Sequence, residues 1–293
     1  MKKRVIALLL AATMAFALTA CGSSSTTEET TDTTDASAAE EAAEDTAEDE
    51  TSAEAEAEES DASALYEEAV GQTYVIGTDT TFAPFEFEND EGEHTGIDIE
   101  LFEAIADEMG FTIEWDILGF SASVAALEAG QVDGVMAGMS ITDERMEKYD
   151  FSDSYYDCSI AVAVASDSEI ESLDDLAGST VVAKTGTTGS QYAEELAEEY
   201  DLELLYAEES SVMYQYVASG QAVACFEDYP IVQYEIARGN VDCKVINTSE
   251  YSYPTGMAVL SGNYPELVAA FNEGFARLQE DGTYDEILAH YFE

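Results

Sequence analysis

The sequence predicts an α/β fold made of two successive lobes with a ligand cleft between them. Segments with strand-like and helix-like patterns alternate from residue 71 onward, and the alternation starts again after Phe151. Polar and charged residues follow several of the expected strands directly. Because open parallel sheets bind ligands at the carboxyl ends of their strands, these residues indicate a ligand site in the cleft.

The first lobe is expected to begin with a strand over residues 74–78. Asp98 is expected to cap the next helix, whose apolar residues recur at helical spacing until Gly110 ends it. A strand over 111–115, a short helix over 121–129 and a buried strand over 132–137 complete the series. This β-α-β-α-β order predicts a parallel sheet.

The second lobe repeats this order. Its expected strands cover residues 160–165, 180–184, 202–206 and 222–226, and its expected helices cover residues 191–200, 212–219 and 231–238. Repetition of one α/β unit predicts two similar lobes.

The first twenty residues have the pattern of a signal peptide. Lys2, Lys3 and Arg4 precede an uncharged run over residues 5–20, which is too short to be a membrane span. The run ends in Leu-Thr-Ala before Cys21, which resembles the lipobox of bacterial lipoproteins and predicts a lipid anchor on Cys21. The alternative is a secreted protein in which Cys21 has no such role.

Residues 21–70 are expected to form an acidic, disordered tether. The segment 22–64 contains no aromatic residue and no cation, and 18 acidic residues lie between Cys21 and Val70. Such a composition buries too little apolar surface to offset its chain entropy, and like charges extend it.

The charge of the remaining chain excludes one class of partner. From Gly71 on, 46 acidic residues face six cationic ones, which gives a formal net charge of −40. A body this acidic is not expected to bind nucleic acid. In such surroundings a cation at the end of an apolar run, as with Arg145 and Lys184, is expected to meet an anion.

The cysteines show no metal-binding spacing, and no metal or other cofactor is expected. Cys158, Cys225 and Cys243 are odd in number and lie in a chain long enough to form a core without cross-links. Free buried thiols are therefore expected, and a Cys225–Cys243 disulfide is the alternative.

The residues that follow the expected strands offer charges of both signs. They are Asp79, Gly138 to Ser140, Lys184 to Gly189, and Glu227 with Asp228. Residues 186–190 open a helix, so their free N–H groups favour an anion. The segment lacks the Gly-Lys-Ser/Thr of a nucleotide-binding loop, and a carboxylate is therefore the expected anion.

In order and spacing, seven segments resemble the polar amino-acid-binding proteins of ABC importers, the extracellular solute-binding proteins of family 3, and their glutamine-binding members in particular. These segments are 78–87, 96–101, 137–145, 151–156, 184–189, 228–230 and 281–284. The resemblance implies a two-lobed, type II periplasmic-binding-protein-like fold with two hinge strands. Lobe 1 would comprise residues 71–155 and 256–293, and lobe 2 residues 160–250.

The resemblance also implies a function and a place in the cell. The protein would be a lipid-anchored, extracytoplasmic monomer that binds a polar L-amino acid and delivers it to a membrane permease. Arg145 would hold the ligand α-carboxylate as a bidentate clamp, with N–H groups of Ser140, Thr188 and Gly189. Asp228 would hold the α-ammonium, together with the Gly138 carbonyl and the Ser140 hydroxyl. Phe82 and Phe120 would enclose the ligand side chain.

Asp79 and Lys184 would then face the distal end of the ligand side chain. One acceptor and one donor match a carboxamide, so glutamine is the first choice. Three departures from the glutamine-type pattern favour an alternative: Ser140 replaces Thr, the loop after Lys184 is one residue longer, and Glu227 replaces His. An added carboxylate indicates that a basic amino acid is the alternative ligand.

A lyase related to cyclohexadienyl dehydratase is the alternative class, with Glu227 and Asp228 as an acid/base pair. Adjacent strand residues point to opposite faces, however, and His94 and His290 are expected at the surface. No catalytic activity is therefore expected. A receptor sensor is not expected either, because nothing after Glu293 would signal across a membrane.

Overall fold

A computed structural model of the protein describes residues 64–292. The expected signal peptide, Cys21 and most of the expected tether lie outside these residues. Within the described part, every helix is too short or too polar to cross a membrane.

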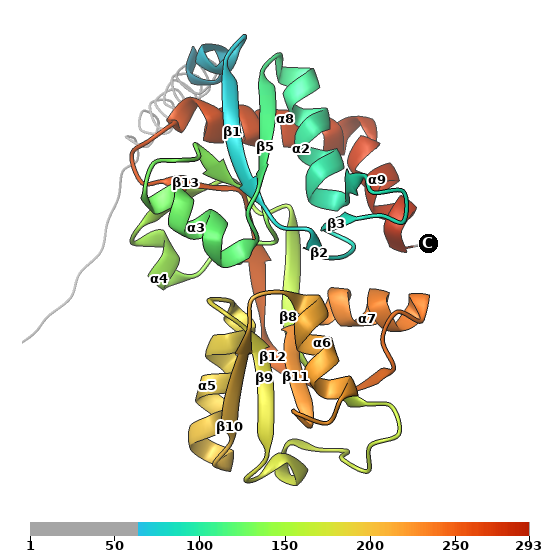
Figure 1. Cartoon of the computed structure of the whole chain (residues 1–293). Helices are drawn as coiled ribbons and strands as arrows, with labels where there is room; N and C mark the ends of the chain where they lie inside the picture. The colour runs from blue at the N-terminus through green and yellow to red at the C-terminus, as the bar shows by residue number, and fades with distance from the viewer. Residues whose placement is uncertain (1–63, 293) are drawn as a thin grey trace, which may run out of the picture. The chain divides into compact units, whose positions relative to one another are not determined.

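The first lobe is built on a five-stranded mixed sheet (Figure 1). Its strands are, in spatial order, β5 (Thr112–Ile117), β1 (Thr73–Thr78), β6 (Gly134–Val135), β13 (Ala258–Leu260) and β7 (Tyr149–Phe151). β1 pairs in parallel with β5 and β6, as the β-α-β order predicts. The prediction of a parallel sheet is wrong for the other half, because β13 is antiparallel to both β6 and β7.

Four helices cover this sheet, and two of them come from the end of the chain. They are α2 (Ile97–Met109), α3 (Phe120–Glu128), α8 (Pro265–Asp281) and α9 (Thr283–Phe292). The rings of Phe102 on α2 and Phe271 on α8 meet edge-on, 5.2 Å apart. Gly274 allows the two helices to approach, because a Cβ there would lie 2.8 Å from a methyl group of Ile105.

The second lobe has the same plan. Its sheet has the order β10 (Glu203–Ala207), β9 (Thr180–Lys184), β11 (Ala224–Asp228), β8 (Tyr156–Ala165) and β12 (Cys243–Thr255). Figure 1 shows α5 (Thr188–Tyr200) on one side of this sheet and α6 (Ser210–Ala218) on the other, and α7 (Tyr229–Arg238) follows β11. β8 is buried on both faces, which explains its nearly continuous apolar sequence.

The strands β8 and β12 connect the lobes. They pair antiparallel from Tyr156, opposite Thr255, to Ala165, opposite Cys243, with irregularities between Val245 and Asn247 and between Thr248 and Ser252. The chain enters the second lobe through β8 and returns through β12 to β13 of the first sheet. These are the two hinge strands that the family resemblance implies.

Several short elements have no counterpart in the sequence prediction. A three-stranded sheet consists of β2 (Thr81–Phe82), β3 (Glu86–Glu88) and β4 (His94–Thr95). The short helices η1 (Glu67–Ala69), α4 (Asp143–Met146) and η2 (Leu173–Leu176) complete the described elements. Ala69 is fully buried in the core of the first lobe, so packed structure begins within the segment expected as a tether.

Four local expectations need correction or comment. Gly96, and not Asp98, is the N-cap of α2, and Asp98 is fully buried inside the protein. His94 is half-buried, and its Nε2 lies 3.0 Å from the carbonyl oxygen of Asp79. The strand expected over 132–137 is reduced to β6, because the chain after Val135 leaves the sheet toward the cleft. Cys158, Cys225 and Cys243 are free thiols.

Candidate ligand-binding site

A small cavity of about 10 Å³ lies between the two lobes. It is about large enough for one water molecule. Its lining residues are Phe82, Phe120, Ala137, Gly138, Ser140 and Arg145 from the first lobe, and Lys184, Thr187, Thr188 and Asp228 from the second. Cations, an anion, hydroxyl groups and aromatic rings thus meet around one point.

Arg145 reaches this cavity from α4. The side chain of Thr142 caps that short helix by accepting the Arg145 backbone N–H. The guanidinium donates to the carbonyl of Ser140 at 2.7 Å and, across the cleft, to the carbonyl of Gly186 at 3.1 Å. It also lies 5.5 Å from the centre of the Phe120 ring. Burial lowers the pKa of Arg145, and the negative charge of Asp228 opposes this effect.

The N-terminus of α5 faces Arg145. Thr187 caps it, since its side chain accepts the N–H of Ser190 at 3.1 Å. The next two residues, Thr188 and Gly189, occupy the first turn, where N–H groups have no acceptor within the helix. The Thr188 hydroxyl pairs with that of Ser140 at 3.1 Å, so the helix end contacts the first lobe directly.

Asp228 ends β11 and is 6% exposed. Burial and repulsion by Glu227 raise its pKa to about 8, against the attraction of Arg145 and Lys184. Its Oδ1 is buried and has no hydrogen-bond partner among the described residues. The Asp228 carboxyl group therefore lies at the wall of the cavity, where Arg145 and Lys184 attract it but its Oδ1 accepts no hydrogen bond from the described residues.

Asp79 and Lys184 form a buried ion pair across the lobes. The Lys184 Nζ lies 2.5 Å from Oδ2 of Asp79, and both side chains are 2% exposed. The other oxygen of Asp79 accepts the N–H groups of Thr80 and Thr81 and the Thr81 hydroxyl. Burial opposes both charges, yet this attraction and these hydrogen bonds hold the pKa of Asp79 below its usual value and that of Lys184 above it.

Phe82 and Gly138 form the part of the wall next to this ion pair. The Phe82 ring lies 5.1 Å from Lys184 Nζ. Gly138 has a φ of 57°, and a Cβ there would lie 2.4 Å from the Phe82 ring. Only glycine fits this position without displacing the ring.

Comparison with known proteins identifies the family to which this architecture belongs. Residues 74–293 match the bacterial extracellular solute-binding proteins, family 3. The chain belongs to this family. The match covers both lobes and both hinge strands.

Three relatives illustrate the range of this solute-binding family. The lysine/arginine/ornithine-binding periplasmic protein of Escherichia coli (strain K12) is 29% identical over 80% of this chain and 92% of that protein. The arginine-binding extracellular protein ArtP of Bacillus subtilis (strain 168) is 28% identical over 99% of this chain and 98% of that protein. The structure of an ancestral arginine-binding protein bound to arginine is similar to this chain, with a TM-score of 0.70 and 33% identity over 75% of this chain and 98% of that one. The structure of an ancestral arginine-binding protein bound to glutamine has a TM-score of 0.69 and 33% identity over 75% of this chain and 97% of that one.

The structure brings most of the predicted site residues of this solute-binding protein together. Eight of them line the cavity: Phe82, Phe120, Gly138, Ser140, Arg145, Lys184, Thr188 and Asp228. Asp79, Gly189 and Glu227 do not line it. Gly189 packs against the backbone of Phe226. Asp79 forms an ion pair with Lys184, which lines the cavity. Glu227 is buried behind Asp228, and the Asp228 backbone N–H donates to the Glu227 carboxylate at 3.2 Å.

The sequence analysis assigned no individual ligand contact to three residues near the cavity. Ala137 lines it, and so does Thr187, which lies within the expected anion-binding segment 186–190. Asp98 lies behind it and accepts the N–H of Gly138 at 2.8 Å. A sequence signal for Asp98 exists, because Asp98 shares the helical face of Leu101, Phe102 and Ile105 and is therefore placed toward the core.

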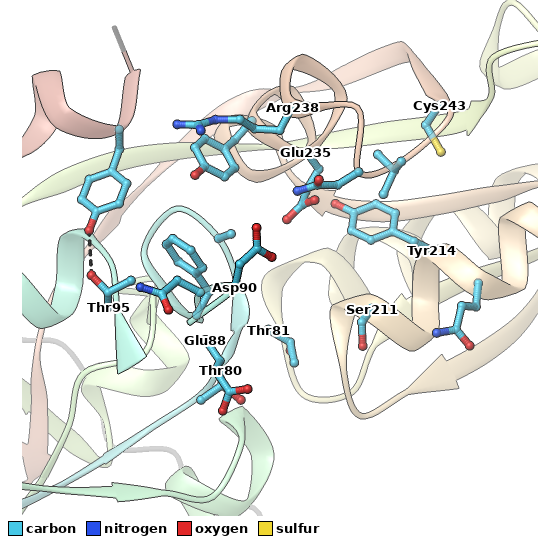
Figure 2. Close-up of a pocket in the computed structure, with 18 of the residues that line it drawn as sticks. Thr80, Thr81, Glu88, Asp90, Thr95, Ser211, Tyr214, Glu235, Arg238 and Cys243 are labelled. Atoms are coloured by element: carbon cyan, nitrogen blue, oxygen red, sulfur yellow. Dashed lines mark hydrogen bonds between the residues drawn. The ribbon is translucent and has the colours of Figure 1, made fainter. Parts of the chain in front are cut away.

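A larger pocket of about 1090 Å³ lies elsewhere between the lobes (Figure 2). It runs between the β2–β3 hairpin with α9 and the helices α6 and α7, and Tyr214, Glu235 and Arg238 are among its lining residues. Neither Arg145 nor Asp228 lines it. We therefore place the candidate ligand site at the smaller cavity, where groups for both ends of a zwitterion converge. Among the described residues, no cluster of side chains suited to a metal ion is found.

Proposed function

We propose that this protein binds an L-amino acid between its lobes and delivers it to the permease of an ABC importer, with glutamine as the first choice of ligand. The observation that carries the proposal is that Arg145 and Asp228 line the same cavity from opposite lobes. A free amino acid carries a carboxylate and an ammonium on adjacent atoms, so it would engage both lobes at once.

The α-carboxylate is assigned to Arg145 and the start of α5. The guanidinium donates to two carbonyl groups, and a carboxylate is a stronger acceptor in the same bidentate geometry. The free N–H groups of Thr188 and Gly189 and the positive end of α5 add to this site.

The α-ammonium is assigned to Asp228, with the Gly138 carbonyl and the Ser140 hydroxyl. A buried ammonium needs a counter-charge and several acceptors. The unpartnered Oδ1 of Asp228 supplies the first of these.

A neutral polar side chain suits the rest of the site. The Asp79 carboxylate already accepts four hydrogen bonds, one of them from Lys184. A second cation next to Lys184 would be repelled. The oxygen of a ligand carboxamide, in contrast, can accept a hydrogen bond from one of the remaining N–H groups of the Lys184 ammonium. This argument favours glutamine over arginine or lysine.

A basic amino acid is the second candidate. The relatives named above bind arginine or the lysine/arginine/ornithine group by name. Glu227 adds a buried negative charge close enough to raise the pKa of Lys184. A basic ligand would require Lys184 to leave Asp79, so that the carboxylate is free for the ligand cation.

Binding requires the lobes to separate. A cavity of about 10 Å³ cannot hold an amino acid, and the contacts of Arg145, Ser140 and Lys184 cross the cleft. Hinge opening along β8 and β12 followed by closure on the ligand is the motion that such two-lobed proteins use.

We further propose that the protein works as a monomer outside the cytoplasm, held to the membrane by lipid on Cys21. This part rests on the sequence of residues 1–21, which lie outside the described residues. The lyase alternative is disfavoured, because Glu227 does not line the cavity beside Asp228 and the two carboxyl groups are not presented together.

Calorimetric titration of the chain from residue 22 onward with each of the twenty amino acids tests the proposal. Glutamine is expected to bind most tightly. Tighter binding of arginine or lysine would establish the second candidate. Absence of heat with every amino acid at millimolar concentration would overturn amino-acid binding itself.

A further inference from the structure

Two buried carboxyl groups lie behind the wall of the candidate site. Asp98 is fully buried at the start of α2, and its Oδ2 accepts the backbone N–H of Gly138 at 2.8 Å. Glu86 is 1% exposed on β3, where it pairs with Phe82 of β2. Neither carboxyl group lines the cavity, but each is one step from a residue that does.

Two contacts hold Gly138 in its conformation. Its φ of 57° places it in the left-handed region, and its Cα packs so closely on Phe82 that a Cβ would lie 2.4 Å from the ring. The hydrogen bond that the Gly138 N–H donates to Asp98 fixes the peptide that enters Gly138, and the Phe82 ring blocks movement from the other side. Together they determine where the following carbonyl points.

The two carboxyl groups need a proton between them. Oε1 and Oε2 of Glu86, Oδ1 of Asp98 and the hydroxyl of Tyr155 are buried, and none has a partner at standard hydrogen-bond geometry among the described residues. Two carboxylates cannot satisfy each other, whereas a protonated carboxyl can donate to a carboxylate. Glu86 and Asp98 lie close together, because the Asp98 backbone N–H donates at 2.9 Å to the carbonyl of Phe85, the residue before Glu86. Neighbouring buried carboxyl groups hold one proton in common.

Charges and titratable groups on other elements determine which group keeps the proton. Burial, then repulsion by Asp98 and Asp79, raise the pKa of Glu86 well above its usual value, against the attraction of Lys184. Burial raises the pKa of Asp98 to about 6, against the hydrogen bond from the Gly138 N–H and the proximity of the Tyr155 hydroxyl and of Glu86. The other titratable groups that face Asp98 are Tyr155, Cys158 and Tyr284. These effects favour the proton on Glu86 and the negative charge on Asp98.

We propose that Glu86 and Asp98 form a one-proton carboxyl pair that positions Gly138, so that ligand affinity depends on two residues that do not touch the ligand. The inference rests on the proposed function for its binding readout. Asp98 is a positioning residue that holds the Gly138 N–H, and Glu86 is the proton-bearing partner that allows Asp98 to remain charged inside the protein.

The test compares Asp98→Ala, Asp98→Asn and Glu86→Gln with the unaltered chain, using calorimetry with the tightest-binding amino acid from pH 6 to pH 9. Asp98→Ala is expected to weaken binding at least tenfold. Asp98→Asn should recover most of this loss, because an amide oxygen still accepts the Gly138 N–H. Asp107→Ala, an exposed change on the same helix, is the control and should bind like the unaltered chain.

The pH dependence of ligand affinity distinguishes a carboxyl pair that shares a proton from two side chains that only fill space. Glu86→Gln mimics the protonated acid and has no proton to lose, so the ratio of its affinity to that of the unaltered chain should rise with pH. A constant ratio, or an Asp98→Ala protein that binds normally, would overturn the inference. If Asp98→Ala does not fold, the pH ratio of Glu86→Gln decides alone.

A readout without ligand separates this inference from the proposed function. The Gly138 amide proton should show an NMR shift that titrates with the carboxyl pair and is flattened in Glu86→Gln. An amide shift that is independent of pH in the unaltered chain would overturn the inference even if amino acids bind. A titrating amide in a protein that binds no amino acid would overturn only the proposed function.

Discussion

At the scale of single residues, the cations decide the chemistry of the cleft. Arg145 and Lys184 are two of the six cationic residues that follow Gly71, and both line the same cavity. The sequence predicts that each meets an anion. The structure shows that Lys184 meets the protein's own Asp79, whereas the Arg145 guanidinium donates to the backbone carbonyl groups of Ser140 and Gly186.

Arg145→Ala should weaken amino-acid binding by about 3 to 5 kcal/mol, because the ligand carboxylate would be buried without its partner. Calorimetry measures the loss, and a thermal melt shows whether the fold is kept. Arg277→Ala is the matched control, since Arg277 forms exposed ion pairs with Glu108 and Glu273 away from the cavity. Equal dissociation constants for Arg145→Ala and the control would place the carboxylate site elsewhere.

Asp228 should make binding depend on pH. Its pKa is raised to about 8, so it is mostly protonated at pH 7, whereas an ammonium ligand needs the carboxylate. Binding should therefore release a proton, and affinity should rise by up to about tenfold per pH unit from pH 6 toward pH 8. The buffer takes up the released proton, so the heat of binding at pH 7 should differ between phosphate and Tris. The difference should equal the number of protons released multiplied by the difference between the ionisation enthalpies of the two buffers. Identical heats would contradict this role for Asp228.

The ion pair between Asp79 and Lys184 should control which side chain is accepted. Lys184→Ala leaves Asp79 and Glu227 without their cation and should shift preference toward lysine or arginine. Asp79→Ala leaves Lys184 unopposed and should let glutamate compete. Shifts of at least about tenfold, roughly 1.4 kcal/mol, are expected in competition binding. If both variants lose all ligands equally, the pair only latches the lobes together and does not read the side chain.

At the scale of elements, segments with a strong local pattern were predicted well. β9 has the predicted bounds, and α3, α5, α6, α7, β10 and β11 lie within three residues of theirs. The short strands β2, β3, β4, β7 and β13 were missed, since so few residues show no period of their own. The long strand β12 was missed as well, because its polar face and its irregular register hide the alternation.

The contact between α2 and α8 depends on Gly274. A Cβ there would lie 2.8 Å from Ile105 and 2.9 Å from Met109, so Gly274→Ala should force the helices apart. We expect a loss of about 1 to 3 kcal/mol of unfolding free energy, larger than the gain of about 1 kcal/mol in helix propensity. Urea unfolding measures the difference. Gln279→Ala, on the exposed face of the same helix, should change stability little. An increase in stability for Gly274→Ala would show that the two side chains move aside at no cost.

At the scale of the whole molecule, both lobes contribute to the wall of the candidate site. Arg145 comes from the first lobe and Asp228 from the second, so a ligand that contacts both residues would bridge the lobes. In the proposed function, ligand binding and lobe closure would therefore be coupled. The chain crosses between the lobes in β8 and β12, which pair with each other along their length.

The lipid proposed on Cys21 and the lobes should act independently. Cys21→Ser should release the protein from the membrane fraction into the medium, because the proposed anchor would be lost. Affinity for the amino acid should not change, since Cys21 precedes the folded lobes by more than forty residues. Fractionation followed by immunoblotting measures release, and calorimetry measures affinity. Retention of the variant in the membrane fraction would contradict a lipid anchor.

The sequence by itself determined the α/β class, the two lobes, the strand ends that meet at the candidate site, and the family. Each of these follows from patterns within about twenty consecutive residues, or from motifs in a fixed order. Only the tertiary structure decided that Lys184 pairs with Asp79, that Glu227 is buried behind Asp228, and that Asp98 supports Gly138 instead of capping a helix. These contacts join residues that are distant in the chain or point to different faces of a strand, and their energies depend on burial, which a local pattern does not specify.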